Sequence, residues 1–139
     1  MTLKFLLDTS VVSAPITKDP NRRVLKKLEQ QSGDCAIAAP VWHELIYGAS
    51  RLPAGKRRTA LEDYLHRVVG PSFPILPYDQ AAADWHARER ARLEEDGRTP
   101  PFVDGQIAAI AFTKGLVLVT ANTKDFRGFA ELTTADWTT

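Results

Sequence analysis

The chain has 139 residues, of which 44% are hydrophobic and 25% charged, an ordinary balance for a globular protein. Lys and Arg number 18 against 17 Asp and Glu, and the formal net charge of +1 gives no overall signal for nucleic acid. This length suits one domain with one hydrophobic core, so we expect a single domain over residues 1–139.

The chain has one cysteine, Cys35, which lies in an apolar stretch. A single cysteine cannot form an intrachain disulfide, so we expect a buried structural thiol in a reducing cytoplasm. No apolar run approaches the roughly 18 residues of a membrane span, and the run after Met1 is too short for a signal peptide. The sequence therefore predicts a cytoplasmic location and no contact with a membrane.

The first part of the chain predicts two strands and two helices. Leu3–Leu7 is an apolar run typical of a buried strand, and Val11–Ala14 can form a short helical turn. Apolar residues recur at helical spacing in Pro20–Gln31 and again in Pro40–Ser50, which predicts two amphipathic helices. Asp34–Ala39 lies between them and predicts a second strand.

The middle of the chain predicts another helix, a strand and a long helix. Pro53–Val69 should be helical up to Gly70-Pro71, which should break the helix. Phe73–Leu76 predicts a short strand, and the proline inside it favours an edge of the sheet. Gln80–Glu95 predicts a helix, with Asp79 as its N-cap.

The last part continues this alternation with a buried helix, a buried strand, a turn and a final strand, at Pro101–Lys114, Leu116–Val119, Asn122–Gly128 and Glu131–Thr133. Strands that alternate with helices along the chain favour an α/β fold. We expect a three-layer α/β/α domain with a mostly parallel central sheet of four to five strands.

Four acidic residues lie where these elements begin or end: Asp8, Glu44, Asp104 and Asp125. Asp8 follows the first strand directly, and Asp125 follows a later strand through a turn. Glu44 and Asp104 lie early in two helices. Strand C-termini and helix N-termini share one edge of a parallel sheet, so all four carboxylates should meet there. Carboxylates without Cys or His beside them are typical of a site for a hard divalent cation.

Each acid taken singly also has a structural explanation. Asp104 could stabilise the positive end of its helix, Glu44 could be an exposed helix residue, and Asp125 could shape a turn. The placement of all four together favours a common site over these separate explanations.

Four segments that contain these acids resemble the four motifs of PIN domains, in the same order: Asp8–Val12, Glu44–Gly48, Asp104–Ala109 and Thr120–Phe126. The last has the pattern T-x-N-x-x-D-F. The resemblance covers essentially the whole chain and is strongest to the VapC toxins of bacterial toxin–antitoxin pairs.

This resemblance implies a metal-dependent endoribonuclease whose four motif acids bind Mg²⁺ or Mn²⁺ and act in catalysis. By the same resemblance, Thr120 and Asn122 support the site. Ser10 and Asn122 could also hold the acids in position by hydrogen bonds. A metal held by carboxylates can activate water and bind a phosphate oxygen, which suits hydrolysis of RNA.

Two basic clusters could guide the RNA backbone, although a solvated helix face explains each cluster alone. They consist of Lys18, Arg22, Arg23, Lys26 and Lys27, and of Arg51, Lys56, Arg57, Arg58 and Arg67. The resemblance further implies a small cognate antitoxin and a homodimer. The antitoxin could lie in a groove between the helices Pro40–Ser50 and Pro53–Val69 and reach the acids with a basic side chain.

Other functions stay open at this stage. A haloacid dehalogenase phosphatase needs a second Asp two positions after the first, where this chain has Ser10. A response-regulator receiver needs an acidic pair after its first strand and a phosphorylated Asp after its middle strand, and neither Asp34–Ala39 nor Phe73–Leu76 ends with such an Asp. A non-catalytic binding module and a PIN nuclease of RNA processing are the alternatives that the sequence leaves.

Overall fold

The computed structural model of the protein describes residues 2–139, and within them five parallel strands form one sheet in the order β3-β2-β1-β4-β5. The strands are β1 (Phe5–Leu7), β2 (Cys35–Ala38), β3 (Ile75–Leu76), β4 (Val117–Val119) and β5 (Thr134–Ala135). β1 is central, and its Leu6 pairs with Ala36 on one side and with Leu118 on the other. The expected α/β fold with a parallel sheet is therefore confirmed.

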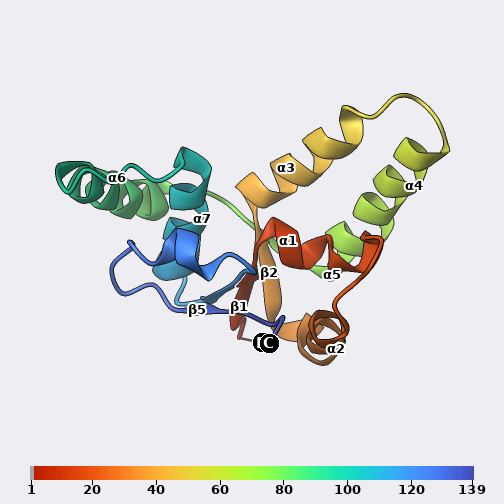
Figure 1. The fold of residues 1–139 in the computed structure, drawn as a ribbon, viewed down its shortest axis with the longest axis horizontal. Coiled ribbons are helices and arrows are strands. Elements are labelled where there is room, and N and C mark those ends of the chain that lie inside the picture. The colour runs from red at the N-terminus through yellow and green to blue at the C-terminus, as the bar shows by residue number, and fades with distance from the viewer. Residues whose placement is uncertain (1) are drawn as a thin grey trace.

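Helices connect the strands: α1 (Thr9–Val12), α2 (Arg22–Gln31), α3 (Ala39–Ser50), α4 (Lys56–Tyr64), α5 (Gly70–Ser72), α6 (Gln80–Glu95) and α7 (Phe102–Thr113). The chain moves from β1 through β2 to β3 in one direction and then crosses back to β4 and β5. Right-handed crossovers in opposite directions place their helices on opposite faces, which produces the three layers. In Figure 1, α3 and α4 project as a helical pair, well apart from α6.

The core lies on both faces of the central strands. Leu6, Ile37 and Leu118, one from each central strand, are completely buried. α7 is buried over most of its length, as its apolar sequence predicts. Cys35 is buried as well, and burial, followed by the charge of Asp34, raises the pKa of its thiol to about 12. The prediction of a buried structural thiol is therefore confirmed as to its burial.

The predicted final strand at Glu131–Thr133 is wrong, because β5 begins only at Thr134, directly after the predicted strand ends, and runs over Thr134–Ala135. Glu131 has φ of +61°, a left-handed conformation that no strand residue adopts. The chain turns at this residue and only then pairs with β4, through Leu118 and Thr134.

The predicted break at Gly70-Pro71 is also wrong, because the chain stays helical to Ser72. The segment Leu65–Val69 forms a π turn, in which the Gly70 amide bonds to the Leu65 carbonyl five residues back. The helix starts later than expected, at Lys56 instead of Pro53. By contrast, β3 lies at an edge, as the proline before it predicts.

The end of β3 leads to α6, and Asp79 caps this helix by accepting a hydrogen bond from the Ala82 amide at 3.0 Å. The N-cap prediction is therefore confirmed. No helix among residues 2–139 is both long and apolar enough to cross a membrane.

Candidate active site

Asp8 lies directly after the central strand β1 and is held on both carboxylate oxygens. Its Oδ1 accepts a hydrogen bond from the Thr9 amide at 2.8 Å, as the N-cap of α1. Its Oδ2 accepts a hydrogen bond from the hydroxyl of Thr120, also at 2.8 Å. The Asp8 amide in turn donates to the Val119 carbonyl at 2.9 Å. These contacts fix Asp8 at the point where the strand order reverses, which is where open α/β sheets bind ligands.

Thr120 links the loop after β4 to Asp8. Its side chain is completely buried, and its hydroxyl donates to Asp8 while accepting the Asn122 amide at 3.0 Å. Ser10 contacts the same loop, where its hydroxyl accepts the Ala121 amide at 3.4 Å. Thr120 therefore touches an acid directly, whereas the contacts of Ser10 and of the Asn122 amide are to the loop that leads to Asp125.

Asp104 lies in the first turn of α7 and is half-buried. Burial raises the pKa of its carboxyl above the ordinary range, and the negative charges of Asp8 and Asp125 raise it further. One charge shifts the pKa of another only at short separation. Asp8, Asp104 and Asp125, three of the four expected acids, therefore lie near one another. β1, α7 and the turn after β4 each contribute one of them.

Asp125 lies in the short 3-10 helix Thr123–Phe126 that follows β4. Its amide donates to the Asn122 carbonyl at 3.0 Å, and its side chain is exposed. The next residue, Phe126, is buried and anchors this helix to the core.

Glu44 lies in the second turn of α3, and its side chain is exposed. It lines a pocket of about 330 Å³ together with Val103 and Gln106, which are close neighbours of Asp104 in α7. Glu44 is not among the charges that raise the pKa of Asp104. Glu44 therefore lies beside the edge of the sheet that carries Asp8, Asp104 and Asp125, across the contact between α3 and α7. This edge is called the acidic edge below.

The acids offer only oxygen ligands, the type that Mg²⁺ and Mn²⁺ prefer. In the described part of the chain, no three His, Cys, Asp or Glu side chains are arranged so that they could hold a metal ion by themselves. Mg²⁺ usually keeps several waters and needs only one or two carboxylates plus substrate phosphates. Burial and the charges of Asp8 and Asp125 raise the pKa of Asp104, and a cation bound beside these carboxylates would favour its ionised form. The residues present therefore fit a Mg²⁺ ion held by few protein ligands.

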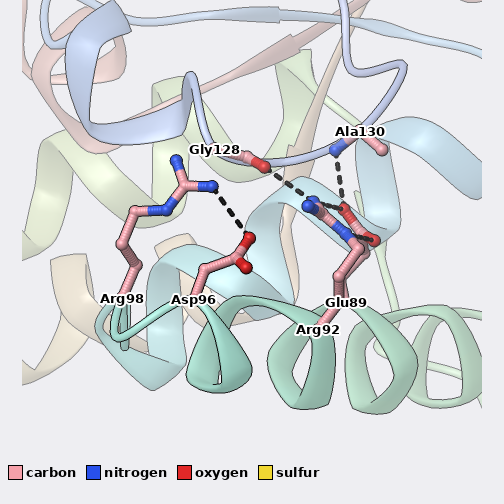
Figure 2. A network of polar contacts seen from close by, with 6 residues as sticks. All are labelled: Glu89, Arg92, Asp96, Arg98, Gly128 and Ala130. Atoms are coloured by element: carbon pink, nitrogen blue, oxygen red, sulfur yellow. Dashed lines mark hydrogen bonds and ion pairs between the residues drawn. The ribbon is translucent and has the colours of Figure 1, made fainter.

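An ion pair between a buried glutamate and a partly exposed arginine, which the sequence does not predict, holds the segment after Asp125. Glu89 of α6 is 8% exposed and accepts the Ala130 amide at 2.6 Å. Arg92, one helical turn away, donates two hydrogen bonds to Glu89 at 2.8 and 2.9 Å and one to the Gly128 carbonyl at 2.8 Å. Figure 2 shows this Glu89–Arg92 clamp between α6 and the loop. From sequence, these residues look like an ordinary helix-surface pair.

We expect the Glu89→Gln variant to lower the free energy of unfolding by about 2 kcal/mol, the typical contribution of hydrogen bonds to a charged group. The hydrogen bonds from the Arg92 guanidinium lower the pKa of the Glu89 carboxyl, and the hydrogen bond from the Ala130 amide lowers it further. Stability from this group is therefore present above the ordinary glutamate pKa of about 4.3 and is lost as pH falls through the lowered value. Urea unfolding at a series of pH values checks this.

The matched control is Glu94→Gln on the same helix, since Glu94 pairs with Arg90 at an exposed surface position. That change should cost less than about 0.5 kcal/mol. Equal losses for the two variants, or a Glu89→Gln deficit that persists at acid pH, would contradict the role of the clamp.

A second unpredicted arrangement lies beside Asp104. His86 of α6 is buried, and its Nδ1 lies 2.8 Å from the Tyr78 hydroxyl. The opposite side of the ring packs on Gly105, where an added Cβ would lie 2.1 Å from His86 Nε2. Burial, followed by the charge of Arg90, lowers the pKa of His86, so the ring is neutral near pH 7. Gly105 therefore allows α6 and α7 to pack closely next to the acidic edge.

Comparison with known proteins agrees with this geometry. Residues 5–132 match the PIN domain family. The chain is 35% identical to the tRNA(fMet)-specific endonuclease VapC of Shigella flexneri over 97% of this chain and 98% of that protein. It is 34% identical to Toxin FitB of Neisseria gonorrhoeae over 87% of this chain and 89% of that protein.

Solved structures show the same similarity. The crystal structure of FitAcB from Neisseria gonorrhoeae superposes with a TM-score of 0.88 at 32% identity, over 96% of this chain and 97% of that one. DNA-bound VapBC from Salmonella typhimurium superposes with a TM-score of 0.84 at 29% identity, over 98% of this chain and 99% of that one. The chain therefore belongs to the PIN domain family, in its VapC branch.

Proposed function

We propose that this protein is a metal-dependent endoribonuclease and the toxin of a toxin–antitoxin pair. The observation that carries the proposal is the carboxyl of Asp104, half-buried within the fields of Asp8 and Asp125 at the switch point of the sheet. Relatives that are named ribonucleases and toxins across nearly the whole chain support the same assignment. One nuclease domain over residues 1–139 suffices for this activity.

In this proposal Asp8 and Asp104 hold Mg²⁺, or Mn²⁺ in its place, with Glu44 and Asp125 at the border of the site. A bound Mg²⁺ ion supplies an acidified water and a positive charge next to the phosphate oxygens. Thr120 and the Thr9 amide keep the Asp8 carboxylate in one orientation, through the two hydrogen bonds to its oxygens. Asn122 and Ser10 support the loop that carries Asp125.

The proposed partner is a small antitoxin, as in the similar toxin–antitoxin complex from Klebsiella pneumoniae. A pocket of about 280 Å³ lies between α4 and the turn after α1, lined by Ile16, Arg57, Ala60 and Leu61. Ile16 is 45% exposed, so an apolar side chain is available there for an amphipathic segment. A basic side chain of that segment could then reach the carboxylates and compete with the metal. A cytoplasmic homodimer is part of the proposal, since two-fold assembly is the commonest kind.

The decisive experiment incubates purified protein with total RNA and with purified tRNA, and maps the ends that form. We expect cleavage with Mg²⁺ or Mn²⁺, none in EDTA, and none once the co-expressed product of a small adjacent gene is bound. Cleavage that persists in EDTA would contradict metal dependence. Cleavage without any inhibiting partner would support a PIN nuclease of RNA processing instead of a toxin. Absence of cleavage on every RNA with metal present would overturn the ribonuclease assignment.

A further inference from the structure

A pocket of about 290 Å³ opens beside Asp125, and three cationic side chains line it: Arg98, Lys124 and Arg127. Its lining includes Asp125 but neither Asp8 nor Asp104, so it extends away from the centre of the acidic edge. The three cations come from two separate loops, and neither of the basic clusters evident in the sequence contributes to it. Lys124 and Arg127 flank the motif acid Asp125 in sequence, and the fold adds Arg98 to them.

The backbone on both sides of the pocket is held in place. On one side, the Arg98 amide donates to the Leu93 carbonyl at 2.8 Å, across a turn in which Gly97 has φ of +71°. This is the hydrogen-bonded glycine end of helix α6. On the other side, the Glu89–Arg92 clamp forms hydrogen bonds with the backbone of Gly128 and Ala130, which follow Arg127 in the chain. Figure 2 shows Arg98 extending from the end of α6 toward the same loop. The pocket is therefore built on a fixed frame.

The cationic groups of the pocket are available for an anion. Arg98 pairs with Asp96 at 3.3 Å, but both side chains are more than half exposed, so a stronger ligand can replace this contact at little cost. Lys124 and Arg127 are exposed and form no ion pair with any residue among 2–139. Three positive charges against the one carboxylate of Asp125 leave the pocket with a net positive charge.

We propose that this pocket binds a phosphate group of the RNA strand adjacent to the phosphate that is cleaved. Guanidinium groups bind phosphate oxygens through paired hydrogen bonds, and two of the three cations are arginines. Asp125 stands at the border between the pocket and the acidic edge, because it lines the pocket and its amide bonds to Asn122. Asn122 in turn bonds to the Thr120 hydroxyl that contacts Asp8. A strand with one phosphate in the pocket therefore continues directly toward the carboxylates. This inference rests on the proposed ribonuclease function and adds where the substrate is held.

The test measures binding of a fluorescein-labelled single-stranded RNA at several salt concentrations, in the presence of Mg²⁺. Asp104→Asn serves as the parent protein so that the RNA stays intact. The pocket variant adds Arg98→Ala and Arg127→Ala. The control variant adds Lys4→Ala and Lys114→Ala, two exposed residues that change the net charge equally and belong to neither basic cluster. Lys4 lies before β1 and Lys114 follows α7, at the end of that helix opposite Asp104.

We expect the pocket variant to bind RNA roughly tenfold more weakly than its parent at about 0.1 M salt, with a salt slope smaller by about 1.4. This corresponds to about 0.7 for each of two lost phosphate contacts on a single strand. The control variant should stay within about twofold of the parent, because its lysines are remote from the pocket.

Equal weakening in the pocket and control variants would overturn the inference, because net charge alone would then explain the effect. Unchanged RNA binding by the pocket variant would also overturn the inference. This includes a result in which the pocket variant binds RNA normally and loses only its capture of a protein partner. RNA cleavage by the unmodified protein is assayed in parallel. If that protein cleaves RNA while the pocket variant binds like the control, the pocket assignment fails and the ribonuclease function stands. If no RNA is cleaved at all, the proposed function fails.

Discussion

Replacing Asp104 or Asp8 by asparagine should reduce RNA cleavage by at least about 10²-fold, because removal of one preorganised electrostatic group in an active site costs about 10²–10³ in rate. Asparagine has nearly the same shape, so the change removes a charge that the metal needs and little else. Cleavage rates with Mg²⁺ over a range of RNA concentrations measure the effect. The loss should fall on the rate constant for cleavage, since RNA binding depends mainly on cationic side chains.

The fold should survive this change. Burial and the charges of Asp8 and Asp125 raise the pKa of Asp104, so its ionised form is unfavourable in the metal-free folded protein. Asp104 therefore contributes its full share of folding stability below the ordinary aspartate pKa, where it is protonated. This contribution is lost as pH rises through the raised pKa of Asp104. At pH 7 without metal, Asp104→Asn should therefore melt no lower than the unmodified protein, and added Mg²⁺ should stabilise it less.

The matched control for the acids is Asp84→Asn on α6, because Asp84 is an exposed acid that forms a surface ion pair with Arg88. This variant should cleave RNA at the full rate. Full activity in both Asp8→Asn and Asp104→Asn, with contaminating nucleases excluded, would show that these carboxylates do not carry the reaction.

The Gly105→Ala variant should lose about 3 kcal/mol of stability, the upper part of the range for overpacking a well-packed core. The new Cβ would lie 2.1 Å from Nε2 and 2.5 Å from Cδ2 of His86. The ring cannot move aside easily, because it is buried, contacts the Tyr78 hydroxyl and packs on Phe102 at a centroid distance of 4.8 Å. Urea unfolding measures the loss, and cleavage should fall as well because Asp104 is the preceding residue.

A double-mutant cycle tests whether the contact with His86 causes this loss. Adding His86→Ala removes the ring, so the double variant should be more stable than the sum of the two single losses predicts. Gly48→Ala in α3 is the matched glycine control, since an added Cβ there meets nothing within 4 Å. That change should be neutral or stabilising by up to about 1 kcal/mol. Additive losses in the cycle would contradict direct packing of His86 on Gly105.

The sequence alone determined the order of strands and helices and the place of Asp8 directly after the first strand. Short apolar runs become buried strands, and a strand that ends in Asp8 presents its carboxylate at the ligand-binding edge of any parallel sheet. α6 and α7 follow from helical periodicity and from the cap residue Asp79. These predictions succeeded because they depend on local spacing and on one general rule about strand direction.

Local patterns failed where backbone geometry depends on packing. Gly70-Pro71 looks like a helix end, yet a π turn accommodates it. Glu131 was expected in a strand, but the chain takes a left-handed conformation there before it pairs with β4. In both places the neighbouring elements, and not residue preferences, decide the backbone conformation.

The family resemblance already named Thr120, but tertiary structure alone decided its contact with Asp8 and the role of Glu89. The Thr120 hydroxyl reaches Asp8 across 112 positions in sequence, and Glu89 holds Ala130 across 41. The cationic pocket likewise joins Arg98 to Lys124 and Arg127 from a different loop. A sequence pattern records neighbours along the chain, whereas a hydrogen bond or a shared charge depends on separation in space. That separation is set only when the sheet and its helices pack together.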